Sequence, residues 1–253
     1  MILMDSITSR KNRIVCHLRS LAGDAEYRKH CREYVCDGEK TLREALAFGA
    51  EINCVLWNER PTEGIDLPKG TEQYTAPGEL YCYASPLKSG SGPVFSVKIP
   101  DKKARAVYDR VIVLENLQDP GNVGTVLRTA NAFGIDAVIL VGACADLYNP
   151  KTVRASMGAI FRQEVLCMDI DELSGFLTMH DLPLYGAALS DAARDIRELE
   201  LHRSAVAIGS EGSGLSEAIL SVCKGSLIIP MRPDSESLNA AIAASVVMWE
   251  MSR

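Results

Sequence analysis

LENLQDPGNVGTVLRTANAFG, residues 114–134, decides the fold of this chain. The apolar run VIVL precedes it and predicts a buried strand. The turn formers at 119–122 then predict a loop, and the apolar spacing that follows predicts a helix over 122–133 that ends at Gly134. A buried strand, a polar loop and a helix in this order are the repeating unit of an α/β fold.

The same order recurs twice toward the C-terminus. The loop GSEGSG (209–214) follows the strand AVAI, and the loop PMRPDSES (230–237) follows the strand LII. Further strands are predicted at AVILVG and LYGAAL, a helix capped by Asn149 at KTVRAS, and a final apolar helix over 237–251. Strands that alternate with helices predict a mostly parallel sheet, and ligands bind beyond the carboxyl ends of its strands. The three loops therefore predict a cofactor site, with four polar residues beside it: Asn122, Arg128, Glu211 and Asn239.

The first hundred residues predict a separate and smaller α/β domain. Helices are predicted over 12–21, 39–49 and 77–84, and strands at EYVCDG, INCVLW, TEQYTA and VFSVKI. The stretch IPDKKARAVYD combines a proline with charges and predicts a linker. The predicted organisation is a first domain over 1–100, a linker over 101–109 and a second domain over 110–253.

The composition disfavours several classes of protein. The eight cysteines contain no CxxC pair, which argues against a zinc site or a disulfide framework and predicts reduced thiols in a cytoplasmic protein. No apolar run approaches the roughly 20 residues of a membrane span, and the N-terminus lacks the pattern of a signal peptide. Neither G-x-G-x-x-G nor G-x-x-x-x-G-K-[ST] occurs, which argues against nicotinamide and P-loop enzymes. We expect no metal.

Charge is distributed unevenly over a chain whose net charge is −6. Residues 1–105 carry 16 Lys and Arg against 14 Asp and Glu, whereas residues 106–253 carry 11 against 19. The segment 9–32 has seven basic and two acidic residues. A basic segment on an acidic protein can bind phosphates, which makes Arg10, Lys11 and Arg13 candidate contacts for a nucleic acid. A solvated helix surface would have the same composition.

Three stretches resemble the motifs of a known family. QDPGNVGTVLRTANAFG, AIGSEGSGLS and the pair IIPM and SLNAAIAAS are similar to the three motifs of the SpoU (TrmH-like) RNA 2′-O-ribose methyltransferases, in the SPOUT superfamily. This resemblance covers about residues 108–253. ITSRKNRIVCHLRSL and EYVCDGEKTLREAL resemble, more loosely, the RNA substrate-binding domain of the ribosomal-RNA members, an α/β fold like that of certain ribosomal proteins. Pro233 replaces the usual glycine of the third motif, among the charged residues Arg232, Asp234 and Glu236.

The resemblance implies a function and an architecture. It implies transfer of a methyl group from S-adenosylmethionine to a ribose 2′-hydroxyl of structured RNA, with ribosomal RNA as the expected substrate. It also implies a trefoil knot in the C-terminal methyltransferase domain and a homodimer formed through that domain. The final helix is apolar around most of its surface, which fits a dimer interface or burial within one subunit. Carried onto this chain, the cofactor pocket falls on Gly209, Glu211, Gly212, Ile229, Met231 and Leu238.

The implied reaction requires groups that hold a ribose hydroxyl beside the methyl donor. None of the four histidines lies in a motif, which disfavours a histidine base. Arg128 matches an arginine of the first motif, and because a guanidinium is almost never neutral, a phosphate clamp suits it better than a base. A surface arginine that pairs with a neighbour is the alternative.

The other candidates have structural alternatives as well. Asn122 is expected to contact substrate, hold its loop or cap its helix. Glu211 is expected to accept a hydrogen bond from the ribose hydroxyl or from Asn122, or to order the knot. Asn239 is expected to contact Arg128 or substrate, with a solvated side chain as the alternative. Arg154 is expected to contact RNA or to be a charge on a helix surface. A non-catalytic RNA-binding or assembly factor on the same fold is the alternative function. The sequence identifies neither the target nucleotide nor the general base, nor the effect of 232–236 on cofactor affinity.

Overall fold

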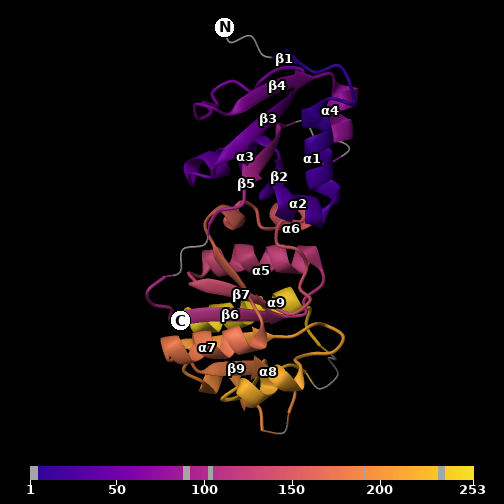
Figure 1. Ribbon diagram of the computed structural model, residues 1–253. Coiled ribbons are helices and arrows are strands. Elements are labelled where there is room, and N and C mark those ends of the chain that lie inside the picture. Colours follow the sequence, from indigo (N-terminus) through magenta and orange to yellow (C-terminus); the bar gives the residue numbers. More distant parts are fainter. Residues whose placement is uncertain (1–4, 88–91, 102–104, 191, 233–236) are drawn as a thin grey trace. The chain divides into compact units, whose positions relative to one another are not determined.

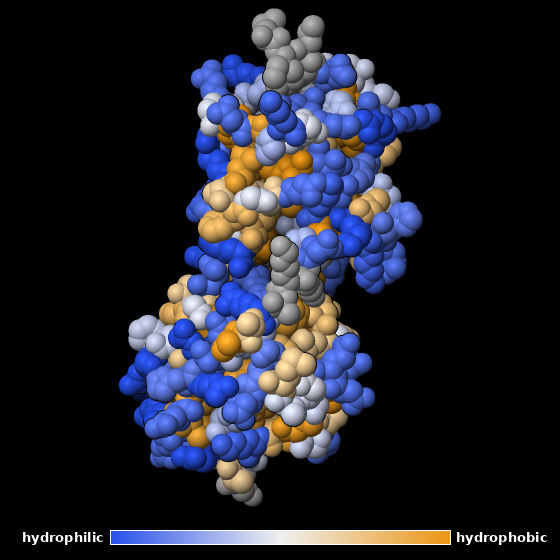
Figure 2. All heavy atoms as spheres, turned by 60° about the vertical axis from the view of Figure 1, so that its left-hand side comes forward, coloured by the Kyte–Doolittle hydropathy of each residue, from blue (hydrophilic) through white to orange (hydrophobic). Residues whose placement is uncertain are grey.

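The computed structural model describes residues 5–87, 92–101, 105–190, 192–232 and 237–253. By its contacts the chain separates into two compact units (Figure 1). The first unit consists of Met1–Asp101 with Asp146–Phe161, and the second of Lys102–Ala145 with Arg162–Arg253. Figure 2 shows one face of the molecule, on which hydrophilic residues predominate and apolar residues gather in patches in both units.

The first unit is built on a mixed five-stranded sheet. Its strand order is β1-β4-β3-β5-β2. β4 pairs in parallel with β1 and with β3, whereas β5 pairs antiparallel with both β2 and β3. Four of the five strands occur where the sequence predicts them. The strands are β1 (Asp5–Ser6), β2 (Glu33–Asp37), β3 (Ile52–Asn58), β4 (Glu72–Ala76) and β5 (Val94–Lys98).

Four helices accompany this sheet: α1 (Arg13–Gly23), α2 (Ala25–Cys31), α3 (Glu39–Ala47) and α4 (Gly78–Ala84). The side chain of Asn12 caps α1 by accepting from the Ile14 backbone N–H, and the apolar face of α1 packs into the core beside Val35 and Leu56. Helix α2 was not predicted, because the one side chain it buries is Arg28, so its sequence shows no apolar period.

Residues 146–161 join the first unit through polar contacts and stacked rings. The guanidinium of Arg28, which is only 4% exposed, donates to the Asp146 carboxylate and to the Leu21 carbonyl. The rings of Tyr34 and Tyr148 lie 4.6 Å apart between centroids. The segment carries α6 (Pro150–Ala155), with Asn149 as its N-cap as predicted, and a 3-10 turn η1 (Ala159–Phe161). Its contacts thus place it with the first unit, although it lies within the sequence range of the predicted second domain, whose boundaries stay a prediction.

The second unit contains a seven-stranded sheet in the order β10-β12-β9-β11-β6-β7-β8. Every strand pairing of this sheet among the described residues is parallel, which confirms the α/β fold class. β6, β7 and β11 are almost entirely buried, as strands covered on both faces must be. The strands are β6 (Arg110–Glu115), β7 (Ala137–Val141), β8 (Glu164–Met168), β9 (Leu184–Ala187), β10 (Arg194–Asp195), β11 (Ser204–Ile208) and β12 (Gly225–Ile228).

Helices cover both faces of this sheet. α5 (Pro120–Ala132) and α9 (Ala240–Met251) pack against each other and against the sheet on one face. α7 (Ile170–His180) and α8 (Glu217–Val222) contribute Leu173, Leu177 and Ile219 to the core on the other face (Figure 1). A short 3-10 turn, η2 (Ile196–Glu198), follows β10.

The predicted start of the last helix was wrong. Residues 237–239 precede α9, and the carbonyl oxygen of the Asn239 side chain accepts from the backbone N–H groups of Ala241 and Ile242. Asn239 is therefore the N-cap of α9 and not a residue one turn inside it. The first motif's helix likewise begins earlier than predicted, at Pro120, because Asp119 caps it.

All eight cysteines are free thiols. Burial raises the pKa of the Cys54 thiol to about 11 and that of Cys36 well above its ordinary value. Across the residues that the structure describes, no helix is long and apolar enough to cross a membrane. The same residues include no cluster of three or more His, Cys, Asp or Glu side chains suited to a metal ion.

Candidate active site

The three loops predicted from the sequence lie at the carboxyl ends of the strands of the parallel sheet. They follow β6, β11 and β12 and lead into α5, α8 and α9. β6 pairs with β11 in a register that places Leu114 beside Ile208, so these two strands end together. β9 lies between β11 and β12, which brings the third loop to the same edge. The parallel topology therefore gathers residues that are more than 100 positions apart in the chain.

Three of the four predicted catalytic residues meet there in one hydrogen-bonded triad. The Oε1 atom of Glu211 accepts from Asn122 Nδ2 at 2.8 Å and from Asn239 Nδ2 at 2.6 Å. Asn239 Nδ2 also lies 3.2 Å from the side-chain oxygen of Asn122. The backbone N–H of Ala240 approaches the same Glu211 oxygen at 3.4 Å. One carboxylate oxygen thus links the loops after β6, β11 and β12.

Helix caps orient the two asparagines of the triad. Asp119 Oδ1 accepts from the backbone N–H of Asn122 at 2.8 Å and so holds the first turn of α5. The side-chain oxygen of Asn239 caps α9, which leaves its Nδ2 group pointing at Glu211. The carboxylate also lies at the N-terminus of α9, where the helix dipole stabilises a negative charge.

A second carboxylate anchors the loop that carries Glu211. Glu115, at the end of β6, is 3% exposed, and its oxygens accept from the Ser216 backbone N–H at 2.8 Å and from the Ser216 hydroxyl at 2.5 Å. Ser216 Oγ in turn caps α8 by accepting from Ile219 N. Neither Glu115 nor Ser216 was predicted from the sequence. A glutamate directly after the apolar run VIVL was the available signal, because a buried charge needs donors.

The glycines of this loop allow its tight path. A Cβ atom on Gly209 would lie 2.2 Å from the carbonyl carbon and oxygen of Gly214, so only glycine fits there. Gly214 itself has a φ of +67°, in the left-handed region. The two glycines close the loop on itself and present Glu211 at its tip.

A polar pocket of about 790 Å³ opens beside the triad. It is formed by the loop after β6 and the loop after β11. Its lining residues are Asn116, Leu117, Gln118, Asp119, Asn122, Ser210, Glu211, Gly212 and Ser213. Asn122 and Glu211, two members of the triad, are among these lining residues.

An apolar pocket of about 120 Å³ lies at the ends of β9 and β12. Three predicted cofactor residues line it, whereas Glu211 and Gly212 line the polar pocket and Gly209 closes its own loop. The wall formed after β9 was not predicted from the sequence, because neither glycine nor charge follows that strand immediately. Residues 233–236 lie outside the described chain. The described lining is Ala187, Ala188, Leu189, Leu227, Ile228, Ile229, Met231, Ser237, Leu238 and Ala243.

The remaining predicted contact residues are not members of the triad. Arg128 is exposed on α5 and forms no hydrogen bond or ion pair with any described residue, so the expected contact with Asn239 is not formed. Arg10 pairs with Glu79, and Arg13 pairs with Glu72 at 2.9 Å. Lys11 is exposed. In the first unit, Arg154 pairs with Asp37 at 3.2 Å.

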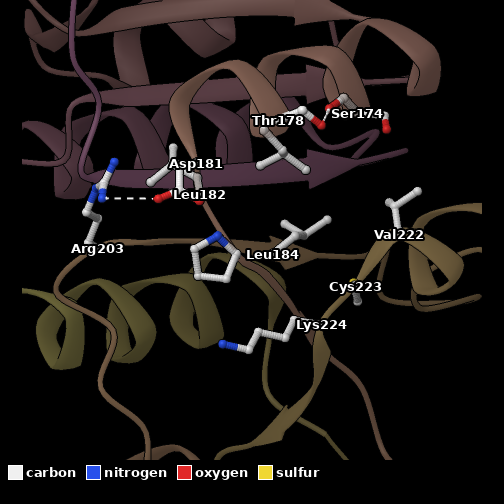
Figure 3. A pocket seen from close by; sticks show the side chains of 11 residues that line it. Ser174, Thr178, Asp181, Leu182, Leu184, Arg203, Val222, Cys223 and Lys224 are labelled. Carbon is white, nitrogen blue, oxygen red and sulfur yellow. Dashed lines mark hydrogen bonds and ion pairs between the residues drawn. The ribbon is translucent and has the colours of Figure 1, made fainter.

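A groove of about 640 Å³ on the second unit lies at the opposite edge of the sheet (Figure 3). It is formed by the C-terminal part of α7 and by the segments that lead into β9 and β12, including Lys224. Arg203 there is balanced by Asp181 at 3.5 Å and Asp109 at 3.6 Å. Burial raises the pKa of the Cys223 thiol to about 11, so the thiol is protonated at neutral pH. The candidate functional site is therefore the side of the sheet where Asn122, Glu211 and Asn239 meet.

Comparison of the sequence with known proteins identifies the family of this chain. The chain matches the model of the SpoU rRNA Methylase family over residues 109–249. It is 33% identical to an uncharacterized tRNA/rRNA methyltransferase of Synechocystis sp., over 98% of this chain and 93% of that protein. It is 28% identical to the 23S rRNA (guanosine(2553)-2′-O)-methyltransferase RlmP of Bacillus subtilis, over 98% and 99%.

Solved structures share the fold over almost the whole chain. A putative RNA methyltransferase of the TrmH family from Porphyromonas gingivalis superposes with a TM-score of 0.85 at 28% identity, over 97% of this chain and 98% of that one. The SpoU methyltransferase AviRb from Streptomyces viridochromogenes, solved in complex with AdoMet, has a TM-score of 0.84 at 24% identity, over 96% and 97%.

The chain belongs to the SpoU rRNA methylase family. It is an RNA methyltransferase that uses S-adenosylmethionine. Membership of this family favours an enzyme over the alternative of a non-catalytic RNA-binding factor. The apolar pocket suits part of this cofactor, because small and aliphatic side chains border it and offer a surface for a flat ring.

The hydrogen bonds between Glu115 and Ser216 lead to a first prediction, which concerns the stability of the protein. Ser216→Ala should lower the free energy of unfolding by about 1.5–3 kcal/mol, because one oxygen of a buried carboxylate loses its donor and α8 loses its cap. Urea denaturation followed by circular dichroism measures this. The control is Ser213→Ala in the same loop, whose exposed hydroxyl contacts Ser210 and whose loss should change stability by less than about 0.5 kcal/mol. Equal effects of the two substitutions would contradict the anchor.

Proposed function

We propose that this protein transfers a methyl group from S-adenosylmethionine to a ribose 2′-hydroxyl of structured RNA, with ribosomal RNA as its substrate in the cytoplasm. The observation that carries the proposal is the triad of Asn122, Glu211 and Asn239 beside a polar pocket. The 2′-O specificity in the name of the Bacillus subtilis relative supports it.

The two pockets are suited to different ligands, the cofactor and the target ribose. The apolar pocket holds the cofactor, with Ile229, Met231 and Leu238 among its walls. S-adenosylmethionine supplies an electrophilic methyl group when bound. The polar pocket holds the target ribose. The start of α9 connects the two pockets, because Leu238 and Ala243 line the apolar one and Asn239 between them donates to Glu211 in the polar one. Alignment of the hydroxyl with the methyl donor is then the main contribution of the protein.

Glu211 is the residue best placed to receive the ribose hydroxyl. Its Oε1 atom already accepts from both asparagines, whereas its Oε2 atom has no hydrogen-bond partner among the described residues. A carboxylate oxygen with free lone pairs can accept a hydrogen bond from the 2′-hydroxyl and raise its nucleophilicity. Asn122 and Asn239 then hold the carboxylate in one orientation.

Arg128 supplies a free positive charge on the helix that begins at the triad. It lies six residues after Asn122 on α5, and its guanidinium is not neutralised by a described residue. The alternative of a surface arginine paired with a neighbour has no support among these residues. A bidentate contact with an RNA phosphate would fix the ribose relative to the pocket.

The last helix supports a homodimer. α9 buries Ala244, Val247 and Met248 within the subunit, yet exposes Ile242, Val246 and Trp249. These three exposed residues follow the i, i+4, i+7 spacing of one helix face. The Trp249 ring meets the ring of Phe133 from α5 at 5.6 Å between centroids. We propose that a second copy covers this apolar face.

The trefoil knot is part of the same proposal. Its support is that the loops after β11 and β12 meet at one edge and that α9 returns across the sheet to pack on α5. A threaded chain is otherwise rare among proteins.

The position of methylation can be tested chemically. RNA incubated with the protein and S-adenosylmethionine should acquire one site that resists alkaline cleavage. The reason is that strand cleavage by alkali uses the 2′-hydroxyl as its nucleophile, and a methylated hydroxyl cannot attack. Sequencing of alkali-treated ribosomal RNA from cells with and without the protein locates the site. Methyl incorporation with an unchanged alkaline ladder would show base methylation and overturn the 2′-O assignment.

Arg128 gives a quantitative prediction. Arg128→Ala should lower the single-turnover rate of methyl transfer by about 100-fold or more, the scale of losing one positioned electrostatic group. Stability should change by less than about 0.5 kcal/mol, because the side chain is exposed and unpartnered among the described residues. A titration with S-adenosylmethionine should show wild-type affinity. A nearly wild-type rate would show that Arg128 is not functional.

Arg128→Lys is the matched control for this substitution. A point-charge contact would survive it in part, whereas a bidentate clamp would not, because lysine lacks the planar fork.

The proposed dimer can be tested with one charge. Trp249→Glu should convert a dimer into a monomer, because it buries an unpaired carboxylate in the apolar interface. Sedimentation velocity measures the change. Met179→Glu is the control, because Met179 is equally apolar and is 79% exposed, but lies on α7 on the other face of the sheet. A monomeric wild-type protein would contradict the dimer.

A further inference from the structure

Two arginines of the first unit share one tyrosine ring. The Cζ atom of Arg19, on α1, lies 4.1 Å from the centroid of the Tyr83 ring on α4, and that of Arg10 lies 4.9 Å from it. Arg19 Nη1 also donates to the Tyr83 carbonyl at 3.2 Å. The guanidinium of Arg19 is therefore held by a cation–π contact and by a backbone oxygen.

The charges on this surface are not balanced equally. Arg10 is paired with Glu79, and Arg13 is paired with Glu72 and contacts the Tyr74 hydroxyl at 3.0 Å. Arg19 has no carboxylate partner within the described part of the chain. Lys11, at the start of the same segment, is exposed and likewise has no such partner there. The positive charge that the sequence places in this segment thus remains free at Arg19 and Lys11.

We propose that Arg19, held against Tyr83, is a preformed contact for an RNA phosphate, with Lys11 as a second cation on the same segment. The inference rests on the proposed function and names the part of the first unit that receives the RNA backbone. It also moves the contact away from Arg10 and Arg13, whose charges are already neutralised in the free protein.

The geometry fits a phosphate. A guanidinium has five N–H donors, and only one nitrogen of Arg19 has a described hydrogen-bond partner. The remaining donors can meet two phosphate oxygens in the fork arrangement that arginine favours. Because the tyrosine already restricts the side chain, less conformational entropy is lost on binding.

The same geometry disfavours reading of a base by stacking. Two guanidiniums already lie over the Tyr83 ring, so the ring is not a free platform for a nucleobase. Contacts to phosphate supply affinity and register but no sequence information. The contact should therefore act alike on RNA molecules of different sequence, while the target nucleotide is selected elsewhere.

The test compares single substitutions in the full-length protein with ribosomal RNA fragments over a range of salt concentrations. Arg19→Ala should weaken RNA binding about 3- to 10-fold and reduce the slope of log affinity against log salt by about 0.7–0.9, the share of one phosphate contact. Arg19→Lys should keep most of the slope but lose part of the affinity, because the charge remains and the fork does not. Tyr83→Leu should give an intermediate loss with an unchanged slope, since it only frees the arginine.

Arg43→Ala is the matched control. Arg43 is an exposed arginine of the same unit, on α3, and it is ion-paired with Glu39 at 2.8 Å. Its substitution should leave both affinity and slope unchanged. Titration with S-adenosylmethionine and circular dichroism should be unchanged for every variant, because the cofactor pocket lies in the second unit.

The outcomes separate the two proposals. If the wild-type protein methylates RNA and Arg19→Ala keeps the wild-type affinity and salt slope, this inference is wrong and the proposed function stands. Loss of affinity with an unchanged slope in Arg19→Ala would also overturn it, because no phosphate contact would have been removed. If the wild-type protein neither binds nor methylates RNA, the proposed function fails and this inference fails with it.

Discussion

The geometry of the candidate active site depends on one oxygen atom, Oε1 of Glu211. It accepts hydrogen bonds from Asn122 and Asn239 and lies near the backbone N–H of Ala240. These donors come from two different loops, and the glutamate comes from a third. Charge-assisted hydrogen bonds of this kind are stronger than neutral ones, so the carboxylate ties together three loops that the parallel sheet already brings close to one another.

The surrounding fold supplies what this interaction needs. A parallel sheet places the carboxyl ends of β6, β11 and β12 at one edge, and the Glu115–Ser216 anchor fixes the far end of the loop that carries Glu211. Asn239 serves the helix and the site at once, since its oxygen caps α9 and its nitrogen donates to Glu211. Local helix stability and site geometry are therefore coupled, because the side chains that cap the helix N-termini also orient the residues of the site.

The first unit follows a different electrostatic design. Most of its exposed arginines have carboxylate partners close by, such as Glu79 for Arg10 and Glu72 for Arg13. Such exposed pairs contribute little stability, but they cancel charge that would otherwise attract anions. Arg19 differs because a tyrosine ring and a carbonyl hold it without cancelling its charge. The buried pair of Arg28 and Asp146 has another role, because it fastens residues 146–161 to α2.

The fold class, the three loops and the residues Asn122, Glu211 and Asn239 could be predicted from the sequence. The reason is that apolar periodicity reports burial, and turn residues report where strands stop. The family resemblance then suggested the roles that we propose for Asn122, Glu211 and Asn239. Two helix predictions failed because of one side chain each. Helix α2 was not predicted because its buried residue is Arg28, which gives no apolar periodicity. Asn239 was predicted to lie inside α9, whereas it is the N-cap of that helix.

The pairing of charged and polar groups could be learned only from the three-dimensional structure. Three features join positions that are tens of residues or more apart in the chain. Glu115 is buried against Ser216, residues 187–189 form a wall of the apolar pocket, and Arg10 and Arg13 are neutralised by distant carboxylates. A linear pattern records what each residue is and how it alternates with its neighbours. It does not record which distant partner lies within 3 Å, and that distance determines whether a charge is free for a ligand or already satisfied.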